Sequence, residues 1–366
     1  MKYYLIAGEA SGDLHGSNLL RALKKPGDVI RAWGGDEMEA AGATIVKHYR
    51  ELAFMGFAEV LMNLRTILRN LTFCKKDILA HKPDVLILID YPGFNLRIAR
   101  WAKTQGIKVI YYISPQVWAW KESRVKNMRK CIDLMLVILP FEKKYFHDKW
   151  NWDVEYVGHP LVEVVNRHLA STPAPALSHK KIIAVLPGSR KQEILKKLPV
   201  MLEVSKSFPD YQFIVARAPG LESSFYESIL KEYPDVMAVT GKTYDLLRQS
   251  EAALVTSGTA TLETALFGVP EVVCYKGNYI SYQIGKRVIK VKYISLVNLI
   301  MDRPVVTELI QNEMNVVNVK RELDLILNNK LRREKMLEDF GVLREMLQQG
   351  EEASSKAAEL IEKSLA

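Results

Sequence analysis

Short apolar segments, each closed by a turn of small or polar residues, recur along the chain and alternate with segments of helical periodicity. The strand predicted over Asp84–Ile89, for example, continues until it reaches Asp90. Strands that are apolar on both faces are typical of a parallel sheet covered by helices on two sides. We predict strands over residues 2–7, 29–33, 84–89, 108–113, 132–139, 181–186, 211–216, 236–239, 252–255 and 271–275.

The strand–helix pattern runs twice, which predicts an α/β protein of two doubly wound, Rossmann-like domains facing a central cleft. A small, proline-rich stretch over residues 168–176 separates the two runs and has the composition of a linker. The 366 residues are enough for two hydrophobic cores. We therefore expect an N-terminal domain over 1–168, a linker over 169–180, a second domain over 181–345 and a C-terminal helix over 346–366, for which the sequence indicates no docking surface.

One strand end in the second half has the composition of a phosphate site. Ser257, Gly258, Thr259 and Thr261 supply hydroxyls and a tight turn where a helix begins, and the free N–H groups of a helix start favour anions. Glu263 follows one turn later, where a diphosphate would repel it and ribose hydroxyls would suit it. An ordinary strand–turn–helix with an N-cap is the alternative interpretation.

A second strand end, Pro187-Gly188-Ser189-Arg190, opens the next helix of the same half. Arg190 is suited to neutralising the charge that develops on a diphosphate leaving group. The alternative is a surface arginine paired with Glu193, three residues further along the same helix face.

Asp90 is the candidate catalytic carboxylate of the first half. It follows an apolar strand, and partial burial there would raise its pKa and suit it to general-base catalysis. The alternative is a helix cap, since Pro92 follows two residues later as at a helix start.

The turn after the first strand carries glycines at positions 8, 12 and 16, which do not form the G-x-G-x-x-G dinucleotide fingerprint. A nicotinamide enzyme is therefore disfavoured. The turn, with Ser11 and Gly12 at the helix start, is suited to an anionic or hydroxyl-rich acceptor. Alternatively the glycines allow close packing of helix and strand.

The net charge of +9 indicates an anionic partner, and its spread along the chain argues against nucleic acid. Residues 54–73 predict an amphipathic helix with a wide apolar face, with Arg65, Arg69, Lys75 and Lys76 supplying basic charge in and just beyond it. Such a helix is typical of contact with an anionic membrane surface, and a helix facing the core is the alternative.

Several classes of site and segment are not indicated. Cys74, Cys131 and Cys274 lie far apart without metal-ligand spacing, and we expect neither a metal nor a cofactor. No run of about eighteen apolar residues occurs, so no transmembrane helix is expected.

In combination, these segments resemble the lipid-A-disaccharide synthases, a family of two-domain GT-B glycosyltransferases of bacterial outer-membrane lipid synthesis. The resemblance runs in order from residue 7 to residue 311, and the residues beyond it are not covered. The matching segments are AGEASGDLHG (7–16), MGFAEV (55–60), IDYPGFN (89–95), SPQVWAW (114–120), VGHPL (157–161), LPGSR (186–190), SGTATLE (257–263), NLI (298–300) and ELIQ (308–311).

The resemblance implies an enzyme that joins UDP-2,3-diacylglucosamine to 2,3-diacylglucosamine 1-phosphate, forming a β-1,6 disaccharide 1-phosphate and releasing UDP. It implies that the UDP phosphates lie at the helix start that follows Thr256 and that Glu263 binds the ribose. Arg190 would lie near the diphosphate, and Asp90 matches the strand-end aspartate of the family. The implied substrate-binding residues are Ser11, Gly12, Ser189, Ser257, Gly258, Thr259, Thr261, Glu263 and Asn298.

We expect a single displacement with inversion, in which Asp90 takes the proton of the attacking hydroxyl and Arg190 stabilises the departing UDP. Some relatives carry a second acidic residue where this chain has Gly93. The alternatives are a UDP-sugar epimerase of the same fold and a non-catalytic UDP-sugar-binding protein. The expected location is cytoplasmic, peripherally associated with the inner membrane, and a homodimer is compatible with the sequence.

Overall fold

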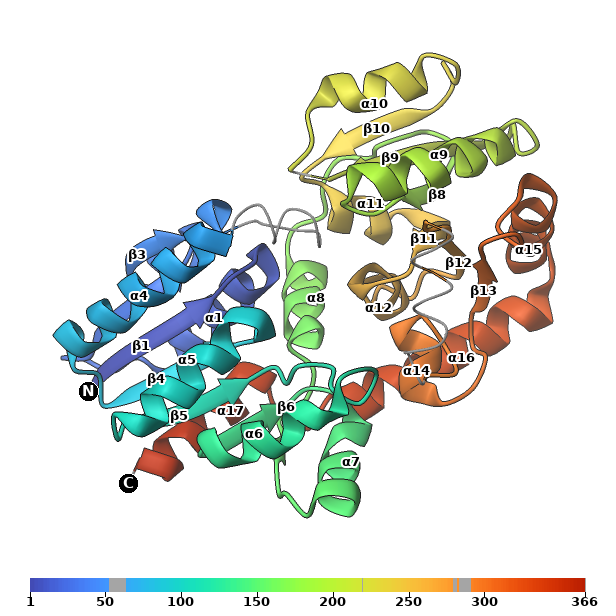
Figure 1. Ribbon diagram of the computed structural model, residues 1–366. Helices are drawn as coiled ribbons and strands as arrows, with labels where there is room; N and C mark the ends of the chain where they lie inside the picture. The colour runs from blue at the N-terminus through green and yellow to red at the C-terminus, as the bar shows by residue number, and fades with distance from the viewer. Residues whose placement is uncertain (53–63, 219, 279–281, 283–290, 366) are drawn as a thin grey trace. The chain divides into compact units, whose positions relative to one another are not determined.

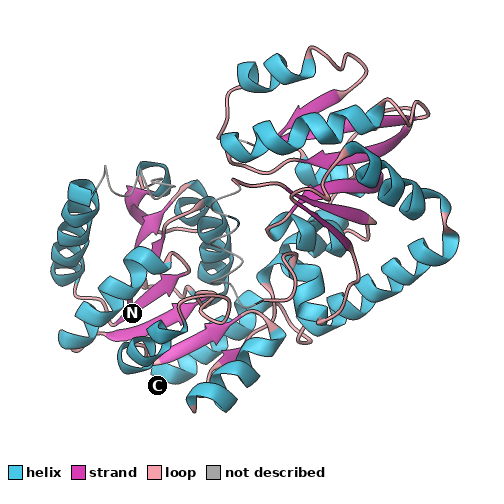
Figure 2. Ribbon diagram, turned by 45° about the vertical axis from the view of Figure 1, so that its right-hand side comes forward, coloured by secondary structure: helices cyan, strands magenta, loops and turns pink. Residues whose placement is uncertain are grey.

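The computed structural model describes residues 1–52, 64–218, 220–278, 282 and 291–365, and the chain divides into two compact units (Figure 1). Unit 1 comprises Met1–Pro160 and Leu347–Ala366, and unit 2 comprises Leu161–Met346. Each unit holds one sheet of parallel strands covered by helices (Figure 2). The prediction of two parallel-sheet α/β domains is therefore confirmed.

The sheet of unit 1 has the order β3-β2-β1-β4-β5-β6-β7, and every pairing in it is parallel. The direction in which the strands follow one another reverses between β1 and β4, which is where doubly wound sheets bind ligands. The strands are β1 Lys2–Ala7, β2 Val29–Gly34, β3 Thr44–His48, β4 Val85–Ile89, β5 Lys108–Tyr112, β6 Leu134–Val137 and β7 Glu155–Tyr156.

Two hydrophobic layers hold this sheet because its central strands are apolar on both faces. All five residues of β4 are buried. Residues of α4, α5 and α6 pack on one face of the sheet, and residues of α1 and α17 pack on the other. The helices of unit 1 are α1 Ala10–Leu23, α2 Asp36–Ala40, α4 Leu64–His81, α5 Pro92–Thr104, α6 Val125–Cys131, α7 Pro140–Trp150 and α17 Ala353–Leu365, with short 3₁₀ turns η1 Tyr49–Glu51 and η2 Glu122–Arg124.

Unit 2 repeats the same design with the strand order β10-β9-β8-β11-β12-β13, again parallel throughout. Its direction reverses between β8 and β11. The strands are β8 Lys181–Leu186, β9 Tyr211–Arg217, β10 Met237–Thr240, β11 Ser250–Thr256, β12 Glu271–Tyr275 and β13 Thr307–Ile310. The helices are α8 Pro160–Ala170, α9 Lys191–Ser205, α10 Ser223–Leu230, α11 Thr243–Arg248, α12 Thr259–Leu266, α14 Leu296–Met301, α15 Val316–Asn328 and α16 Lys330–Leu347.

The ten predicted strands are all present, each within two residues of its predicted bounds. In the described part of the chain, three further strands, β3, β7 and β13, were not predicted. Strands β3 and β7 form the two edges of the first sheet, and β13 forms one edge of the second. Their residues are mostly half-buried. An edge strand needs no continuous apolar run, and the sequence pattern therefore does not reveal it.

The C-terminal helix α17 belongs to unit 1, where it packs beside α1 (Figure 1). Its buried residues Ala357, Ala358 and Ile361 join the hydrophobic layer formed by Leu19, Leu20 and other residues of that face, and Lys25 forms an ion pair of 2.8 Å with Glu362. The structure therefore supplies the docking surface that the sequence did not indicate. The chain returns to unit 1 at Leu347, one residue after the predicted start of the C-terminal segment at 346.

The boundary between the units falls at Pro160, earlier than the 168 predicted, because α8 packs with unit 2. The ring of His168 contacts Tyr244 and Phe267, and Arg248 donates hydrogen bonds to the carbonyls of His168 and Ser171. The predicted linker over 169–180 is likewise attached to unit 2, since the Leu177 amide donates to Gln249 at 2.8 Å.

Candidate functional site

A cavity of about 450 Å³ lies in unit 2 at the carboxyl ends of β8 and β11, where the strand order reverses. Its wall brings together the two strand ends that the sequence singled out. Of the predicted residues, Ser189, Arg190, Ser257, Gly258, Thr259 and Glu263 line it. Ligands of doubly wound sheets occupy this position.

The start of α12 gives this cavity its anion-binding character. Gly258 is the N-cap, with φ of +149°, and no side chain caps the helix. The Ser257 hydroxyl donates to the carbonyl of Ile294 at 2.7 Å, so it has no proton left for a ligand. Backbone N–H groups at the helix start are therefore the donors that the turn offers to a phosphate.

Arg190 is held at the cavity wall by a chain of charges along α9. Its guanidinium lies 3.2 Å from Glu193, whose other oxygen is 3.3 Å from the ammonium of Lys197. Lys197 is buried and also donates to the hydroxyl of Thr256, and burial lowers its pKa. The pairing with Glu193, raised as the alternative, is therefore present, and Arg190 and Glu193 both line the cavity.

Glu263 lines the same cavity and accepts a hydrogen bond of 2.8 Å from the Tyr244 hydroxyl. Burial raises the pKa of the Glu263 carboxyl, although the hydrogen bond from Tyr244 acts in the opposite direction. A carboxylate with one oxygen already held keeps a second oxygen with which to accept hydroxyl protons, as ribose recognition requires.

Two predicted binding residues, Thr261 and Asn298, lie outside the cavity wall and make hydrogen bonds within the protein. Thr261 is fully buried and its hydroxyl donates to the Gly258 carbonyl at 2.9 Å. Asn298 is buried as well. Its amide nitrogen donates to Val306 and Glu308, and its oxygen accepts from the amides of Val305 and Val306. Neither residue lines the cavity, because each is committed to holding the backbone around it.

The cavity wall also contains residues that the sequence analysis did not select, among them Arg217, Thr243 and Tyr275. Arg217 and Tyr275 are the last residues of β9 and β12. Their position at the ends of strands could have identified both residues, because the same criterion identified Arg190 and Ser257.

In unit 1, Asp90 directly follows β4 beside the reversal point of the sheet. Asp90 and Tyr91 both adopt left-handed backbone angles, with φ of +44° and +48°. Such a pair is strained and persists only where its surroundings enforce it. Asn95 donates to the Asp90 carbonyl at 2.8 Å, and the Tyr111 hydroxyl donates to the same oxygen at 2.5 Å.

The start of α5 excludes the helix-cap interpretation of Asp90. The N-cap of α5 is Tyr91, and no side chain caps that helix, so Asp90 is not the helix cap. Burial, together with the nearby negative charge of Glu9, raises the pKa of the Asp90 carboxyl to about 6. A carboxylate with a pKa near neutrality is suited to accept a proton from a hydroxyl.

The glycine-rich turn after β1 serves packing. A Cβ atom on Gly8 would lie 2.4 Å from the Tyr91 ring, and one on Gly12 would lie 3.1 Å from the Cβ of Ala7. Asp13 of the same motif is buried and accepts hydrogen bonds from the amides of Gly35, Glu37 and Met38. Ser11 is exposed at the first turn of α1. The packing role of Gly12, raised as the alternative, therefore matches the structure.

The predicted membrane helix is described only from Leu64 onward, as α4, and residues 53–63 lie outside the described residues. Leu71, Cys74 and Ile78 are buried in the core, so much of the apolar face packs inward. Leu68 and Leu79 remain 54% and 49% exposed. Arg65, Arg69 and Lys76 are exposed on the same helix.

Neither a membrane-spanning helix nor a metal-binding cluster is found in the described part of the chain. No helix there is long and apolar enough to cross a bilayer. No group of three or more histidine, cysteine, aspartate or glutamate side chains there is arranged to hold a metal ion.

Sequence comparisons with known proteins all identify the same family. The sequence profile of the family described as lipid-A-disaccharide synthetase matches residues 3–364. The lipid-A-disaccharide synthase of Syntrophus aciditrophicus (strain SB) is 40% identical, over 98% of this chain and 98% of that protein.

Solved structures that share the fold include both of the enzyme classes raised by the sequence. The glycosyltransferase of kitacinnamycin superposes with a TM-score of 0.69 at 14% identity, covering 100% of this chain and 99% of that one. The UDP-GlcNAc 2-epimerase of Neisseria meningitidis bound to UDP-GlcNAc gives 0.67 at 12% identity, covering 100% and 99%. Fold similarity alone therefore does not separate transferase from epimerase.

Proposed function

Since this chain belongs to the lipid-A-disaccharide synthase family, we propose that it transfers 2,3-diacylglucosamine from UDP to 2,3-diacylglucosamine 1-phosphate, with Asp90 and Arg190 as its catalytic residues. The products are the β-1,6-linked disaccharide 1-phosphate and UDP. The reaction class is hexosyl transfer, which membership of this family supports.

The catalytic assignment rests on the backbone conformation and the raised pKa of Asp90. A strained backbone, held by Asn95 and Tyr111, presents a carboxyl whose pKa is raised to about 6. A protein that only bound a UDP-sugar would have no use for a proton acceptor on the other unit. The strained conformation is likewise typical of a site where function outweighs local stability.

In the proposed step, the 6-hydroxyl oxygen of the acceptor attacks the anomeric carbon of the donor from the face opposite UDP. The new carbon–oxygen bond forms as the bond to the β-phosphate oxygen breaks, and the hydroxyl proton passes to Asp90. The start of α12 and Arg190 stabilise the negative charge that accumulates on UDP. Asp90 then releases its proton to water.

We assign UDP to the cavity of unit 2. The uncapped N–H groups after Gly258 suit its phosphates, and Glu263 with Tyr244 suits the ribose hydroxyls. Arg190 and Ser189 on the opposite strand end complete the polar wall.

The reaction is tested by incubating the protein with UDP-2,3-diacylglucosamine, with and without 2,3-diacylglucosamine 1-phosphate, and measuring UDP and lipid product. We expect UDP release that depends on the acceptor and a disaccharide 1-phosphate product. Acceptor-independent conversion of the donor to an epimer would identify an epimerase instead. Comparable turnover of unacylated UDP-N-acetylglucosamine would contradict the lipid assignment.

We further propose that the enzyme works at the cytoplasmic surface of the inner membrane, to which it binds peripherally. Acylated substrates require access to a lipid surface. The outward side of α4 supports this, because Leu68 and Leu79 lie about three turns apart on one stripe and are flanked by Arg65, Arg69 and Lys76. Each basic residue near an anionic leaflet contributes about 1 kcal/mol.

Replacing Leu68 and Leu79 together by serine should weaken binding to phosphatidylglycerol vesicles by about tenfold or more, because two leucine side chains lose their burial in lipid. Vesicle sedimentation across a salt series measures this, with binding that weakens but persists as salt rises. The control is Leu331→Ser, since Leu331 is 80% exposed on unit 2. Equal binding of the double variant and wild type would exclude this stripe from membrane contact. Leu71 is unsuitable for such a test because it belongs to the core.

A further inference from the structure

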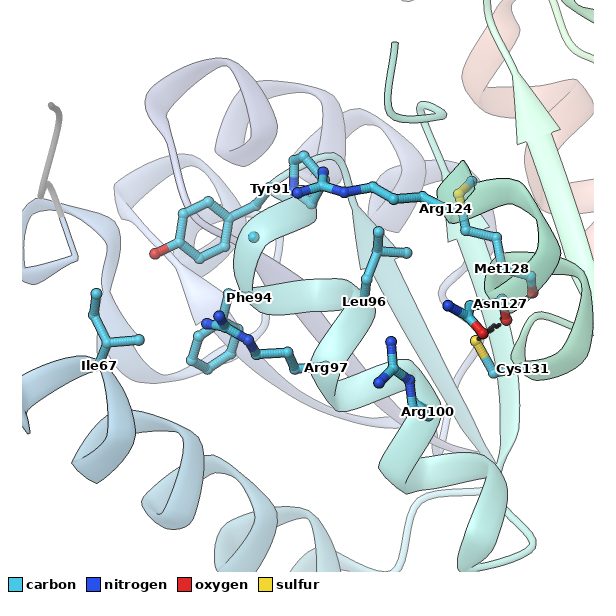
Figure 3. A pocket seen from close by; sticks show the side chains of 12 residues that line it. Ile67, Tyr91, Phe94, Leu96, Arg97, Arg100, Arg124, Asn127, Met128 and Cys131 are labelled. Atoms are coloured by element: carbon cyan, nitrogen blue, oxygen red, sulfur yellow. Dashed lines mark hydrogen bonds between the residues drawn. The ribbon is translucent and has the colours of Figure 1, made fainter. Parts of the chain in front are cut away.

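Unit 1 contains a second cavity, of about 420 Å³, that begins at the residue next to Asp90 (Figure 3). Tyr91, Pro92 and Gly93 form its edge nearest Asp90. Helix α5 and the segment η2–α6 supply most of the rest of the wall. The helix α5 contributes Phe94, Leu96, Arg97 and Arg100, and the segment η2–α6 contributes Arg124, Asn127, Met128 and Cys131, with Ile67 of α4 added.

The polar side of this cavity is strongly cationic. Arg97 and Arg100 are one turn apart on α5, and Figure 3 shows the Arg124 side chain reaching from η2 toward the start of α5, where Tyr91 lies. Among the residues that the structure describes, no acidic side chain lines the cavity. Among the described residues, none of the three arginines forms an ion pair with a carboxylate within 4.0 Å.

Two other basic residues of unit 1 are neutralised by carboxylates. Arg31 forms a salt bridge with Asp77 at 2.6 Å, and Lys103, the next basic residue of α5 after Arg100, is paired with Asp133. Three like charges that converge on one concavity repel one another, and a bound anion would remove that repulsion. The planar guanidinium groups favour a ligand with several oxygens, such as a phosphate.

Apart from Tyr91 and Asn127, the remaining side chains of the wall are apolar. Phe94, Met128 and Cys131 are almost fully buried, and Ile67 and Leu96 are half-buried beside them. A free inorganic anion would leave the accessible parts of Ile67 and Leu96 exposed to water. The combination of arginines and apolar side chains fits an amphiphile with a phosphate on one end and a hydrocarbon chain on the other.

We propose that this cavity binds the acceptor, with its phosphomonoester on Arg97, Arg100 and Arg124 and the start of one acyl chain on the apolar wall at Leu96. This inference rests on the proposed function. In a hexose 1-phosphate, the phosphate and the 6-hydroxyl lie on opposite sides of the ring oxygen. Phosphate binding at the arginines therefore leaves the 6-hydroxyl to extend toward Tyr91 and Asp90.

The three arginines would thus determine which acceptor is used and which hydroxyl reacts. They are positioning residues, since their charge acts on a group remote from the bond that forms. Their loss should raise the acceptor KM far more than it lowers kcat. It should leave the KM for the UDP-sugar unchanged, because the donor cavity lies in the other unit.

The test compares wild type with Arg97→Gln, Arg100→Gln and Arg124→Gln, using diacylglucosamine 1-phosphate and the same lipid without its phosphate. Each variant should raise the KM for the phosphorylated acceptor by about tenfold or more. The KM for the dephosphorylated acceptor should stay within about twofold of wild type, so that the preference for phosphate is lost. The matched control is Lys126→Gln, which removes an exposed positive charge from α6 without touching the cavity.

Binding measured without donor distinguishes the acceptor phosphate from inorganic phosphate and from a membrane headgroup. Wild type should bind the phosphorylated acceptor in detergent micelles, and inorganic phosphate should compete only weakly. If the variants lose affinity for phosphatidylglycerol vesicles and keep their acceptor KM, the cavity takes a membrane headgroup and the inference is overturned. Equal acceptor KM values in all variants and wild type overturn it as well.

Failure of the cavity assignment can be distinguished from failure of the proposed function. If wild type forms no disaccharide from either acceptor, the proposed reaction is wrong. If wild type forms the disaccharide and prefers the phosphorylated acceptor, but the arginine variants keep that preference, only the cavity assignment is wrong.

Discussion

Replacing Asp90 by asparagine is expected to lower turnover by roughly a hundredfold or more, the usual effect of removing a general base. The substitution keeps the size of the side chain. Asparagine also tolerates the left-handed backbone that Asp90 adopts, with φ of +44°. The fold and the affinity for UDP should therefore stay close to wild type, and the change should appear in kcat measured with both substrates saturating.

The control lies at the other end of the same strand. Asp84 immediately precedes β4 and accepts a hydrogen bond from the Lys2 amide at 2.7 Å, far from the carboxyl end of the sheet. Asp84→Asn should leave kcat unchanged. A fully active Asp90→Asn would mean that the proton leaves by another route, and Glu9 would be the next candidate because its charge acts on Asp90.

The pH dependence tests the same assignment independently. The base must be ionised to accept a proton, and the pKa of Asp90 is about 6. Turnover should therefore be constant above that pH and fall by about tenfold per pH unit below it. Glu9→Gln removes a negative charge that raises the pKa of Asp90, so the acidic limb of the profile should move to lower pH. A limb that does not move in this variant would belong to a different group.

Replacing Arg190 by alanine should lower kcat by roughly a hundredfold and change the donor KM little, because the charge on the UDP oxygen grows mainly in the transition state. In the structure Arg190 is paired with Glu193, which is also held by Lys197. Glu193 therefore shares its one negative charge between two cations, and a diphosphate can compete with it for Arg190. Arg190→Lys should recover only part of the activity, because an ammonium cannot reproduce two parallel hydrogen bonds.

Glu263→Ala provides the contrasting result. It should raise the donor KM by about tenfold and spare kcat, since contact with the ribose does not change during the reaction. Lys196→Ala, an exposed position on the helix that follows Arg190, is the control for loss of charge. If Arg190→Ala and Glu263→Ala both raise the donor KM and leave kcat intact, Arg190 only binds the donor.

Residues at strand ends were predictable because a doubly wound fold assigns them a common location. Arg190 and Ser257 are 67 positions apart in sequence, yet both follow strands that meet at the reversal point of one sheet. Thr261 and Asn298 show the limit of this reasoning. Both are polar, and both occur in segments that resemble the family, but their side chains form hydrogen bonds within the protein, to the backbone and, for Asn298, also to Glu308. Composition does not tell whether a hydroxyl or amide points to a ligand or to the chain itself.

The sequence alone determined the fold class, because short strands apolar on both faces have few stable arrangements other than a covered parallel sheet. Its ordered motifs also determined the family, since a profile match over residues 3–364 depends on sequence and not on packing.

Only the tertiary structure decided which of two physically reasonable roles each residue has. It brought the C-terminal helix back onto unit 1, turned Leu71 into the core while leaving Leu68 outside, and denied Asp90 a capping role. It also gathered Arg97, Arg100 and Arg124 around one cavity. These outcomes depend on contacts between residues distant in the chain, and local pattern carries no record of such contacts.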